Sequence, residues 1–599
     1  MKKVFLLISL ILLLTLIYFN DNVKDIAAGV AILIFGMMYL EKGFKYFSGG
    51  PLDKWLKKST SNMFKSITFG VLSTSLLQSS ALISVIAISF LSAGIIELSS
   101  GIGIVFGANI GTTTGAWLIS LFGLKLKVSA FAMPMLIVGV ILVLQSNKIF
   151  KGIGYVLAGI GFLFLGIHFM KEGFESYQQT FNLTQYSMTG VGGLLLYTFV
   201  GILATVIMQS SHASLAIVLT ALAMGQITYD NALAMAIGAN VGTTVTAIIG
   251  SISSNTEGKR LAGAHLVFNL ITGIFALLLI TQFKWIVEGL SGFIGIAKDD
   301  YILKLSMFHT LFNLFGLLIV LPFTPLLIKV LEKFIKYTED DDISQPKFIT
   351  KSALDYPEAA IPALFRESRH LFDNAFEIIS HSLNLHRSDI LSNNKLKELV
   401  PRSTQNMEID IDELYYKKIK LLYRKIVKYS TMIQSSSLDE ESAVLVNKLR
   451  IANRNIIEII KELRIIQRNI FRYSISDNTY IKDEYNYLRL KIAKVMREIY
   501  RTEGVEELKL QEEKLKSLQA KARMHDVLIN GKLDDLIRNR KINSDMATSL
   551  MNDSAIVARI NERLITVAQL LFIEADTIID SDRNEEENGV NDFFEETSL

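Results

Sequence analysis

Two short polar motifs interrupt long apolar stretches of this chain, and each motif occurs twice. Gln-Ser-Ser stands at 78–80 and at 209–211, and Gly-Ala-Asn-x-Gly-Thr-Thr stands at 107–113 and at 238–244. Serine and threonine hydroxyls can donate to anion oxygens, while glutamine and asparagine offer a carbonyl to a cation and an amide to an anion. The motifs therefore predict a site for a small anion, a hard cation, or both.

Both motifs belong to one internal repeat. An ungapped match of polar residues is not expected from apolar composition alone. Duplicated halves with polar interruptions are typical of secondary transporters, whose sites lie near the membrane midplane. Eleven positions recur 131 residues later: Gly70, Thr74, Gln78, Ser79, Ser80, Gly107, Ala108, Asn109, Gly111, Thr112 and Thr113. A flanking helix recurs at an offset of 130: Gly29, Gly36, Gly43 and Phe44.

Apolar stretches long enough to cross a membrane, about 20 residues each, fill the first part of the chain. We expect 4–19 to be a retained first span, because no small-residue cleavage site follows it. If 66–93 and 193–225 are re-entrant hairpins, each repeat has three full spans and the second copy is inverted. If both cross fully, the copies are parallel. The other stretches are 26–44, 101–122, 128–146, 153–170, 231–250, 261–281 and 301–328.

Charge divides the chain near Lys336. Residues 1–335 carry 21 Lys+Arg and 13 Asp+Glu, whereas residues 336–599 carry 40 and 45. This contrast predicts an all-α polytopic membrane domain (1–335) followed by a soluble helical bundle. Neither part is strongly basic, which argues against nucleic-acid binding. The expected parts are repeat one at about 26–147, repeat two at about 153–282, an extra span at 301–328, a linker at 336–355, the helical domain at 356–580 and an acidic tail at 581–599.

Helical spacing of apolar residues organises the second part. The predicted helices are roughly 357–387, 395–434, 438–472, 477–503, 505–531 and 543–580. Lysine and arginine counts place the N-terminus and this domain in the cytoplasm whether or not the broken segments cross fully.

The candidate site lacks basic side chains. Between Lys65 and Lys125 the single charged residue is Glu97, and between Glu175 and Glu257 it is Asp230. Because an unpaired buried charge is costly, an anion there needs half-helix N-termini and co-bound cations. The apparent lack of an intramembrane carboxylate argues against a proton relay of the Asp/Glu kind.

The paired motifs resemble the sodium–phosphate cotransporter family, its type II group and bacterial relatives, over about residues 26–330. The resemblance implies inverted repeats, two re-entrant hairpins and sodium-driven phosphate movement. Vertebrate members have a third serine after Gln-Ser-Ser, where this chain has Ala81 and His212. The implied binding residues are Gln78, Ser79, Ser80, Asn109, Thr112, Thr113, Gln209, Ser210, Ser211, Asn240, Thr243 and Thr244, with His212 as a further candidate and with Gly107, Gly111, Gly238 and Gly242 for close backbone approach or helix packing. His265-x-x-Phe268-Asn269 and His309-x-x-Phe312-Asn313 also look like bacterial features, and buried interhelical hydrogen bonding is the favoured role for them.

The helical domain resembles a PhoU-like domain by its position and pattern. Such domains bind metal through acidic pairs spaced i, i+4, a spacing that Glu408/Asp412 and Asp373/Glu377 share. A solvated helix face is the favoured reading in a segment so rich in charge.

We expect a sodium-coupled phosphate symporter of the cytoplasmic membrane, with sodium as co-substrate, no cofactor, and a homodimer as a candidate assembly. The same fold carrying another oxyanion, or moving phosphate outward, is the first alternative. A membrane-anchored phosphate-signalling protein is the second. An enzyme is disfavoured, since no nucleophile–base set is apparent.

Overall fold

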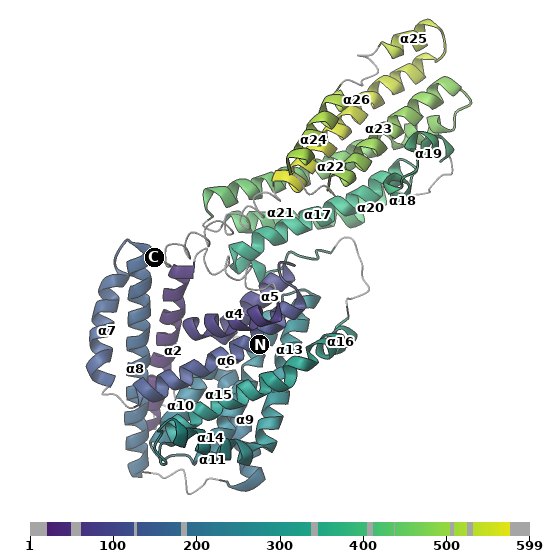
Figure 1. Ribbon diagram of the computed structural model, residues 1–599. Coiled ribbons are helices and arrows are strands. Elements are labelled where there is room, and N and C mark those ends of the chain that lie inside the picture. Colours follow the sequence, from purple (N-terminus) through teal and green to yellow (C-terminus); the bar gives the residue numbers. More distant parts are fainter. Residues whose placement is uncertain are drawn as a thin grey trace, which may run out of the picture. The chain divides into compact units, whose positions relative to one another are not determined.

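The computed structural model describes residues 21–48, 62–124, 128–180, 188–336, 345–403, 411–435, 438–503, 508–523 and 531–574. Over these ranges the regular secondary structure is helical, without strands (Figure 1). The all-α prediction is therefore confirmed. The chain divides into two compact units, 1–337 and 338–599, which we call the membrane unit and the second unit. The expected span 4–19 and the acidic tail 581–599 lie outside the described residues.

Seven helices of the described chain are long and apolar enough to cross a membrane, as expected of a polytopic membrane protein. Large apolar side chains on their outer faces, such as Leu195, Phe199, Ile207 and Leu278, are exposed, which suits contact with lipid. The helices of the membrane unit are α2 (Asp21–Ser48), α4 (Met63–Leu77), α5 (Ser80–Ser92), α6 (Leu98–Leu118), α7 (Val128–Val143), α8 (Lys148–Thr180), α9 (Gly190–Met208), α10 (Ser211–Ala223), α11 (Tyr229–Gly242), α12 (Thr244–Ser251), α13 (Thr256–Leu278), α14 (Ile280–Phe293), α15 (Tyr301–Val320) and α16 (Thr324–Phe334).

Each Gln-Ser-Ser motif divides an apolar segment into two helices. The first motif separates α4 from α5, and the second separates α9 from α10. At 1.5 Å per residue, the 15 residues of α4 and the 13 of α5 give lengths of about 22 and 20 Å. Both are shorter than the hydrocarbon core of about 30 Å.

The repeated helices α2 and α8 pack along a seam of glycines. A Cβ on Gly29 would lie 2.7 Å from the carbonyl oxygen of Gly166, and one on Gly36 would lie 2.7 Å from that of Gly159. Contacts advance along α2 while they retreat along α8, so the two helices are antiparallel. With the 130-residue offset, Gly159 is the copy of Gly29 and Gly166 the copy of Gly36. The seam is therefore a self-complementary contact between copies, of the kind that a two-fold axis produces.

The glycines of the second motif also serve close helix packing. A Cβ on Gly107 would overlap the backbone of α4 at Ile67, and one on Gly238 would overlap α9 at Thr198. Gly107, Gly111 and Gly238 lie inside continuous helices, Gly242 is the last residue of α11, and the pocket described below includes none of the four. Of the two roles left open for these glycines, the structure gives them helix packing. The same set of contacts shows that α4 runs parallel to α6, and α9 parallel to α11.

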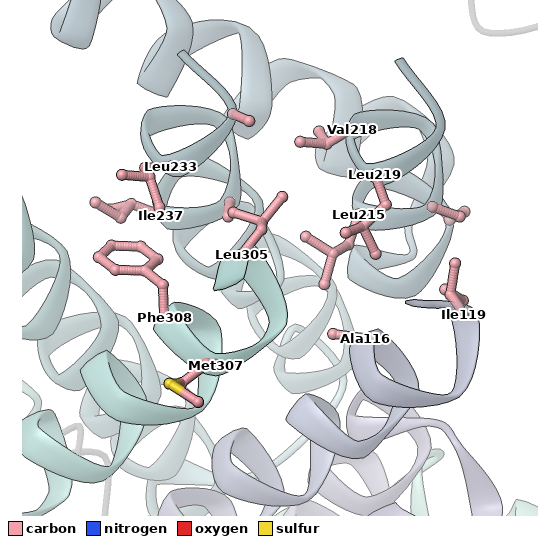
Figure 2. Close-up of a cluster of buried hydrophobic side chains, with 14 of the residues drawn as sticks. Ala116, Ile119, Leu215, Val218, Leu219, Leu233, Ile237, Leu305, Met307 and Phe308 are labelled. Atoms are coloured by element: carbon pink, nitrogen blue, oxygen red, sulfur yellow. The ribbon is translucent and has the colours of Figure 1, made fainter. Parts of the chain in front are cut away.

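An apolar cluster packs around α10, the helix that follows the second Gln-Ser-Ser motif (Figure 2). Leu215 and Leu219 of α10 pack with Ala116 of α6 and with Leu305 of α15 in this fully buried group. Because lipid tails are as apolar as leucine, this packing stabilises the unit through van der Waals contact and not through removal of leucine from water. The cluster therefore fixes α10 against α6 one turn beyond the polar break.

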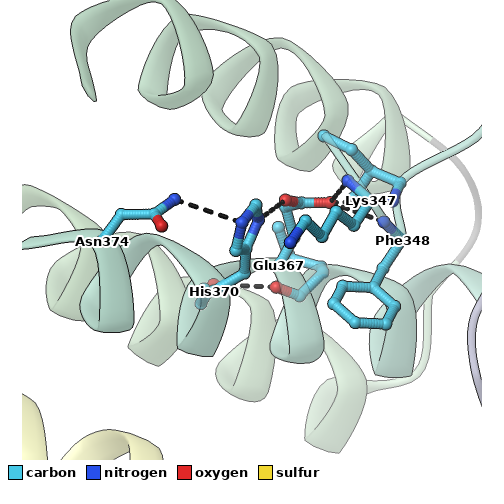
Figure 3. A network of polar contacts seen from close by, with 8 residues as sticks. Lys347, Phe348, Glu367, His370 and Asn374 are labelled. Carbon is cyan, nitrogen blue, oxygen red and sulfur yellow. Dashed lines mark hydrogen bonds and ion pairs between the residues drawn. The ribbon is translucent and has the colours of Figure 1, made fainter. Parts of the chain in front are cut away.

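The second unit begins with a segment tied down by one buried carboxylate (Figure 3). Glu367 Oε2 accepts hydrogen bonds from the backbone N–H groups of Lys347, Phe348 and Ile349, at 2.9, 2.7 and 3.1 Å. Its Oε1 lies 2.8 Å from Nδ1 of His370. Part of the expected linker 336–355 is thus an ordered strap on helix α17 (Pro357–Ser382).

One long helix predicted in the second unit is wrong. The expected helix 395–434 is broken after Arg402, where Ser403 leaves helical geometry, and the described chain is helical again from Ile411 to Gln434. The buried guanidinium of Arg489 donates to the carbonyl oxygens of Leu383, Val400 and Ser403, at 2.8, 3.0 and 3.0 Å. The helices of this unit are α17, α18 (Arg387–Leu391), α19 (Leu396–Arg402), α20 (Ile411–Leu414), α21 (Lys420–Gln434), α22 (Glu440–Ser474), α23 (Thr479–Glu503), α24 (Leu508–Arg523), α25 (Lys532–Arg538) and α26 (Ser544–Ala568).

Candidate functional site

The two Gln-Ser-Ser breaks have the same backbone geometry. Gln78 and Gln209 adopt the left-handed conformation, with φ of 53° and 52°. The next residue caps the following helix: Ser79 Oγ accepts from the N–H of Leu82 at 3.3 Å, and Ser210 Oγ accepts from that of Ala213 at 3.2 Å. Left-handed glutamine is strained relative to glycine, and such strain is concentrated at functional sites.

Both breaks open into one pocket of about 160 Å³. The motifs are 131 residues apart in sequence, yet the fold brings all six of their residues to the same cavity. Its polar lining is Glu41, Gln78, Ser79, Ser80, Gln209, Ser210, Ser211, His212, Thr243 and Thr246, and its apolar lining is Ile34, Met37, Met38, Ala81 and Met208.

The pocket is suited to an anion without using basic side chains. Helices α5 and α10 both start at its wall, so the free N–H groups and positive dipole ends of two helices meet there. Four serine hydroxyls stand beside them. No lysine or arginine lines this pocket in the described part of the chain.

One carboxylate lines the pocket, which corrects the expectation that the membrane segments carry none. Glu41 lies on α2, within the candidate span Lys24–Phe44. In the sequence Glu41 stands near the end of an apolar stretch. The packing of α2 on α8 along the glycine seam directs the face that carries Glu41 toward the two Gln-Ser-Ser breaks. A signal was present: the repeat places Lys171 at the equivalent position, 130 residues later, so the copies differ in charge there.

The two glutamines are not equivalent. The amide nitrogen of Gln78 donates to the carbonyl oxygen of Ser75 at 2.5 Å and to Thr114 Oγ1 at 3.1 Å, which fixes the side chain. The side chain of Gln209 is exposed to the pocket. Gln209 is therefore the side chain that can reorient on a ligand.

Most polar residues of the second motif lie outside this pocket. Thr243 is the one that lines it, whereas Asn109, Thr112, Thr113, Asn240 and Thr244 do not. The Thr112 and Thr113 hydroxyls donate to carbonyl oxygens of their own helix, each at 2.8 Å. These groups support the helices behind the breaks.

Three asparagines from three helices form a buried cluster behind the pocket. Asn240 Nδ2 donates to Asn313 Oδ1 at 3.0 Å, and Asn269 Nδ2 donates to the carbonyl oxygen of Asn240 at 3.0 Å. The interhelical hydrogen bonding expected of the two His-x-x-Phe-Asn motifs is thus made by their asparagines. The buried ring nitrogens of His265 have no hydrogen-bond partner among the described residues.

The acidic pairs of the second unit are used in ion pairs. Asp412 contacts Arg464, Asp373 contacts Arg387 at 3.1 Å, and Glu377 lies 3.1 Å from His381. Glu408 lies outside the described residues. The described ranges contain no group of three or more His, Asp or Glu side chains that could hold a metal ion.

Comparison with known proteins finds a family that matches most of the membrane unit. Residues 32–172 and 183–297, which contain both Gln-Ser-Ser breaks, match the family described as Na+/Pi-cotransporter. The membrane unit belongs to the Na+/Pi-cotransporter family. This family is one of transporters rather than enzymes, and the chain is accordingly a multi-pass membrane protein.

Relatives of this Na+/Pi-cotransporter unit are distant. The chain is 26% identical over 426 residues to the Escherichia coli K12 protein named "Putative inorganic phosphate export protein YjbB", covering 69% of this chain and 72% of that one. It is 27% identical over 315 residues to the Bacillus subtilis "Uncharacterized protein YqeW", covering 51% and 96%. The first alignment is longer than the membrane unit, so the similarity extends into the second unit. No solved structure matches the chain.

Proposed function

We propose that this protein moves inorganic phosphate across the cytoplasmic membrane by coupling it to sodium. The observation that carries the proposal is the convergence of both Gln-Ser-Ser breaks on one pocket. Two helix N-termini and four serine hydroxyls face a cavity that no lysine or arginine of the described ranges lines, inside a unit of the Na+/Pi-cotransporter family.

Charge balance is the argument for sodium. Two helix N-termini supply about +1 in total, while a phosphate group carries about −1.5 to −2. Glu41 adds a further negative charge to the wall. The deficit is roughly two positive charges, because an uncompensated charge is costly away from water. Sodium ions held by the Glu41 carboxylate and by neutral side-chain oxygens would supply the deficit.

We further propose that the copies are inverted and that the breaks are tips of re-entrant hairpins. The antiparallel seam between α2 and its copy α8 supports inversion. Because α4 and α6 run parallel, the chain must reverse between them, and the 13 residues of α5 are the segment available to do so. The lengths of α4 and α5 are too short for full spans. Both termini are then cytoplasmic, and the second unit is a cytoplasmic PhoU-like regulatory domain.

Reconstitution in liposomes tests the function. Labelled phosphate uptake is followed with an inward sodium gradient, with the gradient reversed, and with choline replacing sodium. We expect uptake that follows the sodium gradient. Sodium-indifferent uptake would overturn the coupling, and full uptake by the Gln78→Ala, Gln209→Ala double variant would overturn the site.

Export of phosphate is the second candidate, and the name of the Escherichia coli relative favours it. The same liposomes, loaded with labelled phosphate, measure efflux on orientation-sorted protein. Efflux toward the side opposite the second unit, driven without an inward sodium gradient, would establish export as the physiological direction.

A further inference from the structure

The two halves of the pocket differ at the position after Gln-Ser-Ser. The first copy has Ala81 and the second has His212, and both line the pocket. A second pair of equivalent positions also differs: Gly115 in the first copy corresponds to Thr246 in the second. At both positions the second copy has the larger side chain.

The structure explains how the larger side chain at 212 is accommodated. A methyl group on Gly115 would overlap the imidazole of His212, and it would lie 2.8 Å from Oε1 of Gln78. Helix α10 packs on α6 at this point, and the equivalent helices of the repeat, α5 and α12, also pack on each other. Gly115 thus leaves room for a large side chain at 212, while the smaller Ala81 and the larger Thr246 both line the pocket on the other side of the repeat.

The imidazole that occupies this space has a ring nitrogen that makes no hydrogen bond within the described residues. His212 is 6% exposed, lines the pocket, and has no hydrogen-bond partner for Nε2 in the part of the chain that the structure describes. A neutral imidazole has one N–H donor and one nitrogen acceptor. A buried nitrogen acceptor beside the serine donors and helix N-termini of this lining distinguishes ligands that carry a hydrogen from ligands that do not.

We propose that His212 selects hydrogen-bearing oxyanions by accepting the O–H of hydrogen phosphate. Sulfate has the same shape but no hydrogen at neutral pH, so one of its oxygens would face the nitrogen lone pair unbonded. Sites that hydrogen-bond a substrate group reject analogues that lack it. The inference rests on the proposed function, since it concerns the specificity of that same site.

The decisive variant keeps the packing and removes the acceptor. His212→Ala combined with Gly115→Thr gives the second copy the Ala–Thr pair that the first copy already uses. In liposomes, labelled phosphate transport is measured against rising sulfate, together with the phosphate KM. We expect the ratio of the sulfate inhibition constant to the phosphate KM to fall by about tenfold or more, since an unpaired buried group is what rejects sulfate.

Two single variants test whether the acceptor, and not the ring, is responsible. The Oδ1 of His212→Asn stands near Nδ1 of the histidine, and the Oε1 of His212→Gln stands near Nε2. We expect one of the two to restore discrimination, which also identifies the nitrogen used. Rescue by neither would overturn the proposal.

Glu41→Gln is the matched control, because Glu41 is the carboxylate acceptor in the same lining. If this variant accepts sulfate while the His212→Ala, Gly115→Thr variant still excludes it, the proposal is wrong. The proposed function fails separately: in that case the wild-type protein moves no phosphate under any gradient, before any variant is compared.

Discussion

The left-handed glutamines predict an unusual separation of stability from transport. Gln209 has φ of 52° and an exposed side chain. A non-glycine residue pays roughly 1–2 kcal/mol in this conformation, and glycine pays about 0.5–1 kcal/mol more than alanine for its unfolded-state freedom. Gln209→Gly should therefore be more stable than Gln209→Ala by about 0.5–1 kcal/mol, although both lack the side chain.

Gln78 supplies the internal comparison. Its amide makes two hydrogen bonds that both substitutions remove, at about 0.5–1.5 kcal/mol each. We expect Gln78→Gly to be no more stable than wild type, yet again more stable than Gln78→Ala. At both positions the glycine variant should be more stable than the alanine variant. Relative to wild type, the two positions should differ: Gln209→Gly should be at least as stable, and Gln78→Gly no more stable.

The assay pairs unfolding with transport on the same four variants. Unfolding midpoints in detergent give the stability order, and labelled phosphate uptake in liposomes gives function. All four should lose most of their uptake, so Gln209→Gly should be at least as stable as wild type but impaired. If alanine is as stable as glycine at both positions, the strain argument is refuted.

Three further predictions concern the second unit. Glu367→Ala should lower the free energy of unfolding of this unit by about 3 kcal/mol, because three backbone N–H groups lose their acceptor. Hydrogen exchange at residues 347–349 should rise. Unchanged exchange there would contradict the role of Glu367 in ordering this segment. Arg489→Lys should cost about 2–3 kcal/mol by urea unfolding, since one ammonium cannot reach carbonyls on both sides of the guanidinium; an unchanged midpoint would count against it. Burial raises the pKa of Asp553 above its ordinary 3.8, so the folded state holds this proton more tightly and stability falls as pH rises from about 4 through the folded pKa. Asp553→Asn should flatten that part of the stability–pH curve, and an unaltered slope would disprove the assignment.

The sequence could predict the breaks because glutamine and serine within apolar runs are local signals. That the two copies meet in one pocket was implied by the resemblance to a transporter family, whose sites lie at the repeat interface, and not by the spacing of the motifs. Glu41 was missed since the side of a helix that faces a site depends on packing between helices, which the α2–α8 seam decides. The assignment of Asn109 and Thr112 to binding stays a prediction: their residue types suit ligands, but residues of the same types also stabilise helices from within, and these two lie outside the pocket.

The glycine seam has a mechanical consequence. Its glycines recur every seven residues, so an equivalent register of α2 on α8 is about 10.5 Å away by helix rise. Any smaller slide would press a side chain against backbone, since a Cβ at these glycines already meets backbone at 2.6–2.9 Å. We therefore expect α2 and α8 to move together as one rigid unit. Met37, Met38 and Glu41 lie on α2, so we expect a change in access to the pocket to come from movement of the broken helices relative to this helix pair.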